Sequence, residues 1–120
     1  MSTRQEKLNE LLREEVSHIL RREFKDPRLG FVTVTGAEIS PDLRHAKIFV
    51  SIMGSEEEKQ RNMAVLKNAE SFTRQALAKR VKMKILPQIE FKLDTSVERG
   101  VRIFELLEQV KREEGKKEGA

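Results

Sequence analysis

The change of hydrophobic period along the chain is the feature that most restricts its fold. Between Thr3 and Phe24, apolar residues recur at spacings of three and four with charged residues between them, which indicates an amphipathic helix. This helix is expected to stop at Asp26, because the residue before Pro27 is pushed out of the helical region. Farther along, the pattern changes to the two-residue alternation of strands, returns to helical spacing, and then alternates again.

Two strand-like segments follow the first helix, at residues 31–39 and 44–52. Both are rich in Val, Ile, Phe and Thr, and the Ser-Pro-Asp sequence at 40–42 supplies turn chemistry, so we predict a β-hairpin. In the first strand the alternation changes phase across Gly36, which predicts a β-bulge. In the second strand, one face is predicted to carry Ala46, Ile48, Val50 and Ile52.

A long helical pattern and a third strand come next. Ser55 and Glu58 form a capping-box pattern that opens a helix reaching about Arg80. Residues 89–93 alternate apolar and charged side chains, which predicts a strand entered through Leu86 and Pro87. The buried stripe of the long helix is expected to consist of Val65, Ala69, Phe72 and Ala76, flanked by Leu66 and Leu77.

The C-terminal region is predicted to hold one more helix and a tail. Thr95 with Glu98 can cap this helix, which would carry Val101, Phe104, Leu107 and Val110 inward. The end of the chain has almost no apolar residues, so we expect a single domain at residues 1–112 and a disordered charged tail at 113–120. The whole order predicts an α+β fold in which a three-stranded sheet has its helices packed on one face.

Composition argues against several kinds of functional site. The 120 residues include no cysteine, which excludes disulfides, thiolate metal sites and a cysteine nucleophile. His18 and His45 have no metal-binding spacing and no nucleotide-binding glycine motif occurs, so we expect no metal, no cofactor and no enzyme activity. No apolar run has the length of a signal peptide or membrane span, which predicts a cytoplasmic protein without a membrane partner.

Positive charge is concentrated in one segment, although the net charge is only +4. No acidic residue occurs between Glu70 and Glu90, whereas five basic residues do: Arg74, Lys79, Arg80, Lys82 and Lys84. Such a cluster can neutralise phosphates with little sequence preference, but a solvated charged surface is an equally good interpretation of these residues alone. All six aromatic residues are Phe, which gives little support to base stacking.

Two segments of the chain resemble the ribosome-binding factor A family: DPRLGFVTVTGAEISPDLRHAKIFVSI and LKNAESFTRQALAKRVKMKILPQIEFKLDTSVERGVRI. The order of elements is also similar to a type II KH domain, which implies the order α-β-β-α(kink)α-β-α. KH domains clamp the nucleotide backbone with a Gly-x-x-Gly loop, and no pair of glycines here has that spacing. In the family that the chain resembles, an interhelical kink marked by Ala-x-Gly replaces this loop. The matching residues here are Ala69, Glu70 and Ser71, with Ser71 where glycine is usual.

The resemblance implies a non-catalytic factor that binds the small (30S) ribosomal subunit and its 16S rRNA late in maturation, and we expect it to act as a monomer. It also implies roles in processing the 5′ end of this rRNA and in cold adaptation. The five basic residues are then predicted to contact the rRNA backbone. One alternative is a protein-binding adaptor that uses the open face of the sheet or the C-terminal helix. Another is an enzyme acting on RNA, which lacks acid, base and metal groups in the sequence.

Overall fold

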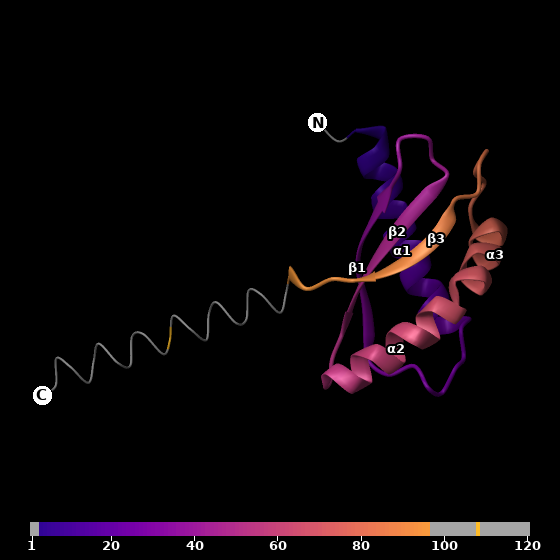
Figure 1. The fold of residues 1–120 in the computed structure, drawn as a ribbon. Helices are drawn as coiled ribbons and strands as arrows, with labels where there is room; N and C mark the ends of the chain where they lie inside the picture. The colour runs from indigo at the N-terminus through magenta and orange to yellow at the C-terminus, as the bar shows by residue number, and fades with distance from the viewer. Residues whose placement is uncertain (1–2, 97–107, 109–120) are drawn as a thin grey trace, which may run out of the picture.

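A computed structural model describes residues 3–96 and residue 108 of the chain (Figure 1). The elements follow in the order α1 (Arg4–Arg22), β1 (Val32–Ile39), β2 (His45–Ile52), α2 (Glu56–Asn68), α3 (Glu70–Arg80) and β3 (Gln88–Leu93). The predicted C-terminal helix and the tail at 113–120 lie outside the described residues, and so does the predicted domain boundary at residue 112.

The three strands form one sheet in the order β1-β2-β3, with β2 antiparallel to β1 and parallel to β3. The predicted hairpin turn is confirmed, because Asp42 Oδ1 accepts a hydrogen bond from the Arg44 N–H at 3.1 Å. The register of the β1–β2 pair shifts between Val34 and Gly36, which confirms the β-bulge.

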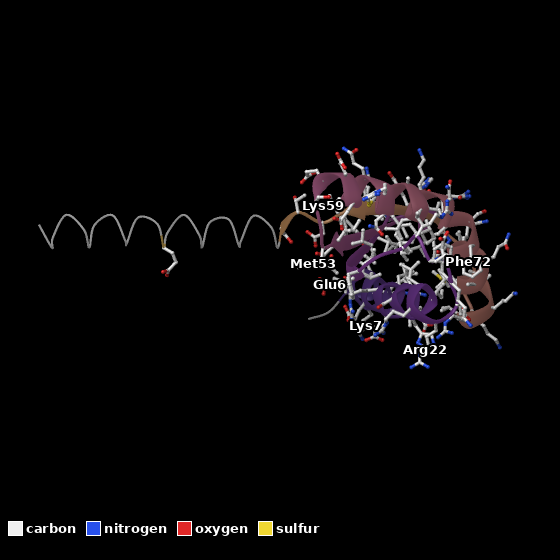
Figure 2. All side chains as sticks on the ribbon, turned by 90° about the horizontal axis from the view of Figure 1, so that it is seen from below. Glu6, Lys7, Arg22, Met53, Lys59 and Phe72 are labelled. Carbon is white, nitrogen blue, oxygen red and sulfur yellow. The ribbon has the colours of Figure 1, made fainter. Side chains whose placement is uncertain are left out.

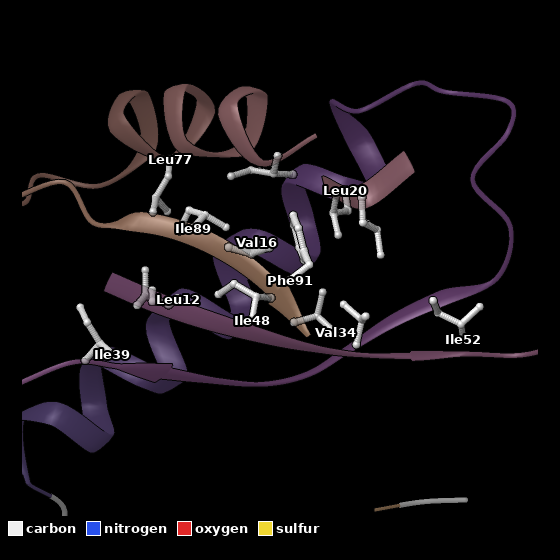
Figure 3. Packing of buried hydrophobic residues seen from close by; sticks show 14 residues of the cluster. Leu12, Val16, Leu20, Val34, Ile39, Ile48, Ile52, Leu77, Ile89 and Phe91 are labelled. Carbon is white, nitrogen blue, oxygen red and sulfur yellow. The ribbon is translucent and has the colours of Figure 1, made fainter. Parts of the chain in front are cut away.

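One face of this sheet packs against the helices and forms the core (Figure 3). Ile89 and Phe91 of β3 are buried beside the predicted inner face of β2, so the two-residue alternation is confirmed in both strands. The helices cover this face with the apolar stripe of α1 and with Leu66 and Leu77. The described part of the chain therefore has the predicted α+β architecture. The residues that α1 buries are Leu12, Val16, Ile19 and Leu20.

Side chains from the helices satisfy backbone groups on both edge strands. On β1, Asn9 Oδ1 accepts a hydrogen bond from the Ile39 N–H at 2.8 Å, and Gln5 Nε2 donates to the Ile39 carbonyl at 3.2 Å. On β3, Glu70 Oε2 accepts a hydrogen bond from the Phe91 N–H at 2.8 Å. Because edge strands carry backbone groups that no neighbouring strand pairs, these bonds both cover the edges and tie α1 and α3 to the sheet.

The long helical pattern is divided at Ala69, and α2 and α3 run in different directions (Figure 1). Ala69 is buried and has φ −87° and ψ −4°, at the edge of the right-handed helical region and typical of the third residue of a type I turn. Its N–H donates to two carbonyl oxygens, those of Val65 at 3.0 Å and Leu66 at 2.9 Å. Sharing one donor in this way is common where a helix ends.

The residues that α3 buries differ in part from the predicted stripe. Thr73 and Leu77 are fully buried, whereas the side chain of Phe72 is 40% exposed. The prediction that Phe72 belongs to the buried stripe is therefore wrong. The buried residues Leu66, Ala69, Thr73 and Leu77 follow one another at spacings of three and four, so the stripe on α3 is centred on Thr73 and Phe72 lies at its edge.

Candidate nucleic-acid interface

The five basic residues predicted to bind RNA lie on α3 and on the segment that leads into β3. Arg74, Lys79 and Arg80 belong to α3, and Lys82 and Lys84 lie between α3 and β3. Neighbouring groups divide these residues into two kinds. The two arginines bond to other parts of the fold, and the three lysines are exposed.

Arg74 holds the segment before β3 in place. Its Nε donates to the Pro87 carbonyl oxygen at 3.1 Å, and its Nη2 donates to the Leu86 carbonyl oxygen at 3.1 Å. The rigid fork of the guanidinium suits two neighbouring acceptors, and here both are backbone carbonyls. Arg74 therefore positions the approach to β3, and part of its hydrogen-bonding capacity is already used within the protein.

Arg80 joins α3 to α1. Its Nε lies 2.6 Å from Glu15 Oε2, and its Nη1 lies 3.7 Å from Glu23 Oε1. The carboxylate of Glu15 on α1 and that of Glu23, which caps the end of α1, thus compensate one guanidinium. Sequence reasoning could not find these partners, because 65 residues separate Arg80 from Glu15 along the chain.

Lys79, Lys82 and Lys84 form what we call the lysine surface. All three residues are exposed, and within the described part of the chain none of their ammonium groups takes part in an ion pair. Exposed ammonium groups of this kind can neutralise phosphates and release their counterions. The lysine surface is therefore the part of the predicted cluster that is best suited to a polyanion.

A pocket that the sequence did not reveal lies where α3 meets the end of α1. It has a volume of about 400 Å³ and is lined by Arg22, Glu23, Lys25, Phe72, Gln75, Ala76 and Lys79. We call it the Phe72 pocket. Arg22 had no predicted role, and Lys25 lies in the loop after α1, beside Asp26. The packing of α1 against α3 brings both next to Lys79, and no local pattern predicts this contact.

The three residues predicted to form the kink differ in what they expose. Ala69 is buried, and the carboxylate of Glu70 accepts the bond from β3 described above, so of the three only Ser71 has an exposed side chain. Ser71 lies in the first turn of α3. Among the described residues, positive φ angles occur at Leu43 and Gly54, so the backbone at position 71 does not need the freedom of glycine.

The described residues contain no group of three or more His, Asp or Glu side chains that could hold a metal ion. None of the described helices combines the length and the apolar character needed to cross a bilayer.

The clearest shift in acidity belongs to a turn, where the side chain and backbone N–H of Arg28 lower the pKa of Asp26 to about 2. The exposed lysines described above can bind anions such as phosphate.

Comparison with known proteins identifies similar chains. A model of the ribosome-binding factor A family matches residues 4–107. Ribosome-binding factor A of Halothermothrix orenii is 50% identical over 111 residues, which cover 92% of this chain and 91% of that protein.

Solved structures give the same similarity. The crystal structure of ribosome-binding factor A from Thermus thermophilus has a TM-score of 0.66 and 28% identity, and the match covers 76% of this chain and 97% of that one. A homology model of the T. thermophilus factor, fitted into a cryo-EM map of a complex with the 30S subunit, has a TM-score of 0.60 and 29% identity. That match covers 72% of this chain and 91% of the fitted one.

Proposed function

The chain belongs to the ribosome-binding factor A family, and from this we propose that it binds the small (30S) ribosomal subunit and its 16S rRNA as a non-catalytic assembly factor. The observation that carries the proposal is the family match over residues 4–107. The similarity to the T. thermophilus factor that was fitted into a 30S complex supports it. The finer roles in late maturation, in processing of the 5′ end of the rRNA and in cold adaptation belong to the same proposal.

The contact with rRNA runs through the lysine surface. Each ammonium group that pairs with a phosphate releases a counterion, which gives affinity without reading the base sequence. Arg74 and Arg80 act differently, because their bonds to the loop carbonyls and to Glu15 hold α3 and the loop that carry the lysines. The proposed action is occupancy, in which the factor holds one rRNA arrangement and no covalent bond is made or broken.

The test compares two double variants that remove the same charge from different places. Lys82→Gln with Lys84→Gln removes two cations of the lysine surface, and Lys47→Gln with Lys67→Gln removes two exposed cations from β2 and α2. We measure the dissociation constant for purified small subunits across a range of salt concentrations. The first variant should bind more weakly, and its log–log salt slope should be shallower by about 1 per lysine. The second should match the unmodified protein.

Lys82 and Lys84 are chosen because the other basic residues have additional roles. Arg74 and Arg80 stabilise the fold, so weaker binding of a variant that lacks them could result from unfolding and not from a lost contact. Lys79 also lines the Phe72 pocket. If both double variants keep the affinity and salt slope of the unmodified protein, the lysine surface is not the rRNA contact.

A protein-binding adaptor is the second candidate function, and one observation favours it. Phe31 and Met53 are neighbours, since the Met53 N–H donates to the Phe31 carbonyl oxygen at 3.3 Å, and their side chains are 85% and 74% exposed. Two large apolar side chains at one end of the sheet could pack against a partner protein. Binding through such a surface should depend little on salt, in contrast to binding through phosphates.

A further inference from the structure

The Phe72 pocket combines an aromatic ring with uncompensated positive charge. We infer that this pocket binds an unpaired nucleotide of RNA, whose base stacks on Phe72 and whose phosphates contact Arg22, Lys25 and Lys79. The inference rests on the proposed function for its partner and adds a second kind of contact to it. The lysine surface contacts only the backbone, whereas the pocket requires a base that has left its helix.

The ring of Phe72 is both accessible and held in place. Its side chain is 40% exposed, and its ring centroid lies 5.5 Å from that of Phe24 at an interplanar angle of 54°. This tilted contact lies within the range of favourable aromatic pairs. Phe24 thus supports one side of the ring and leaves another part open to the pocket. A ring that is already ordered loses little conformational entropy when a base stacks on it.

The charge around the ring favours a polyanion. Arg22, Lys25 and Lys79 are exposed, and within the described residues none of the three forms an ion pair. Glu23 is the acidic residue in the lining, and Arg80, whose Nη1 lies 3.7 Å from its Oε1, is shared with Glu15, so the lining holds three cations and one anion. Figure 2 shows Phe72 and Arg22 toward one end of the domain and Met53 toward the other. The positive charge of the pocket therefore lies away from the exposed apolar side chain of Met53.

The size and polarity of the pocket fit one nucleotide better than a duplex. Its volume of about 400 Å³ lies in the usual range of small-ligand sites. Gln75 in the lining is exposed, and its carboxamide can both donate to and accept from the edge of a base. In double-stranded RNA the bases are already stacked on each other, so only a loop, bulge or chain end can place a base on Phe72.

The absence of Trp and Tyr from the chain makes a direct test of stacking possible. Phe72→Trp introduces the sole indole, whose fluorescence a stacked base quenches. Phe31→Trp is the matched control, because Phe31 is also an exposed phenylalanine but does not line the pocket. Titration with a six-residue single-stranded oligoadenylate at low salt should quench Phe72→Trp in a saturable way and leave Phe31→Trp unchanged.

A second pair of variants measures how much the ring contributes to affinity. Phe72→Leu keeps an apolar side chain against Phe24 but removes the aromatic face, and Phe31→Leu is its control. Fluorescence anisotropy of a labelled oligoadenylate should show affinity weakened by about 5- to 150-fold for Phe72→Leu, the usual loss of one stacked base. Phe31→Leu should bind like the unmodified protein. Circular dichroism and thermal midpoints establish that each variant is folded.

The outcomes separate this inference from the proposed function. If Phe72→Trp is not quenched while the labelled oligoadenylate still binds, the pocket holds phosphate alone and the inference is overturned. An equal affinity of Phe72→Leu and the unmodified protein overturns it as well. If the unmodified protein binds small subunits but not the oligoadenylate, the inference fails and the proposed function stands. If it binds neither, both fail.

Discussion

At the scale of single residues, the hydroxyl of Thr73 makes a buried hydrogen bond at the helix break that should stabilise the fold. Thr73 is fully buried, and its Oγ1 donates to the Ala69 carbonyl oxygen at 2.8 Å. Thr73→Val keeps the volume but loses this bond, so it should lower the free energy of unfolding by about 1 kcal/mol. Urea denaturation measures the change. Thr33→Val, at an exposed position of β1, is the control and should cost nothing. Equal stabilities of the two variants would contradict the prediction.

A second residue-scale prediction concerns the turn after α1. The pKa of Asp26 is about 2 because Arg28 donates to it from its side chain at 2.7 Å and from its backbone at 2.9 Å. Since the pKa is lower in the folded state than the ordinary 3.8, this carboxylate contributes stability above about pH 4 and loses it as the pH falls toward 2. Arg28→Gln should raise the pKa of Asp26, measured by carbon-13 NMR titration. The pKa of Asp42, which Ser40 and the backbone of Arg44 lower, should not move.

Whether the contacts of a single residue could be predicted depended on how far apart the partners lie in the sequence. The predicted cap of α2, in which Ser55 Oγ accepts from the Glu58 N–H at 3.2 Å, and the turn around Asp42 involve neighbours in sequence, and local patterns describe such contacts well. The partners of Arg80 and the surroundings of Phe72 arise from tertiary packing. No spacing in the sequence distinguishes Arg80, which is bonded to Glu15, from Lys79, which is exposed.

At the scale of elements, Glu70 connects the first turn of α3 to the edge strand β3. Its carboxylate accepts the Phe91 N–H, which faces away from β2. Glu70→Ala leaves this donor without its partner and should lower the free energy of unfolding by about 1–3 kcal/mol, whereas Glu70→Gln retains an acceptor and should cost less. Thermal and urea unfolding test the order of the three proteins. If Glu70→Ala and Glu70→Gln are equally stable, the bond does not contribute to holding α3 against the sheet.

The order of the elements could be read from the sequence because helices and strands have different hydrophobic periods. The helix break differs, since periodicity alone runs through Ala69 without interruption and only the resemblance to a family implied a kink. The break is seen in the local geometry of Ala69, in its shared N–H and in its φ and ψ angles. The buried stripe continues across the break through Ala69, Thr73 and Leu77, which leaves Phe72 at its exposed edge, where it lines the Phe72 pocket.

At the scale of the whole molecule, positive charge rather than apolar area is expected to govern binding. The lysine surface and the Phe72 pocket together contain five candidate cations: Arg22, Lys25, Lys79, Lys82 and Lys84. Within the described residues none of them is ion-paired. They lie on α3, on the loop that follows it and around the end of α1. The exposed apolar pair of Phe31 and Met53 lies elsewhere, so the two candidate surfaces can be changed independently.

The last prediction uses this separation to distinguish RNA binding from protein binding. If about four or five phosphates are neutralised, the affinity for small subunits should fall with salt at a log–log slope of about −3 to −4. Phe31→Ser with Met53→Ser should keep this slope and the affinity, because it removes exposed apolar area and no charge. Sedimentation of the labelled protein with purified small subunits at several salt concentrations measures both quantities. A slope near zero, together with loss of binding in the double variant, would instead favour the protein-binding adaptor.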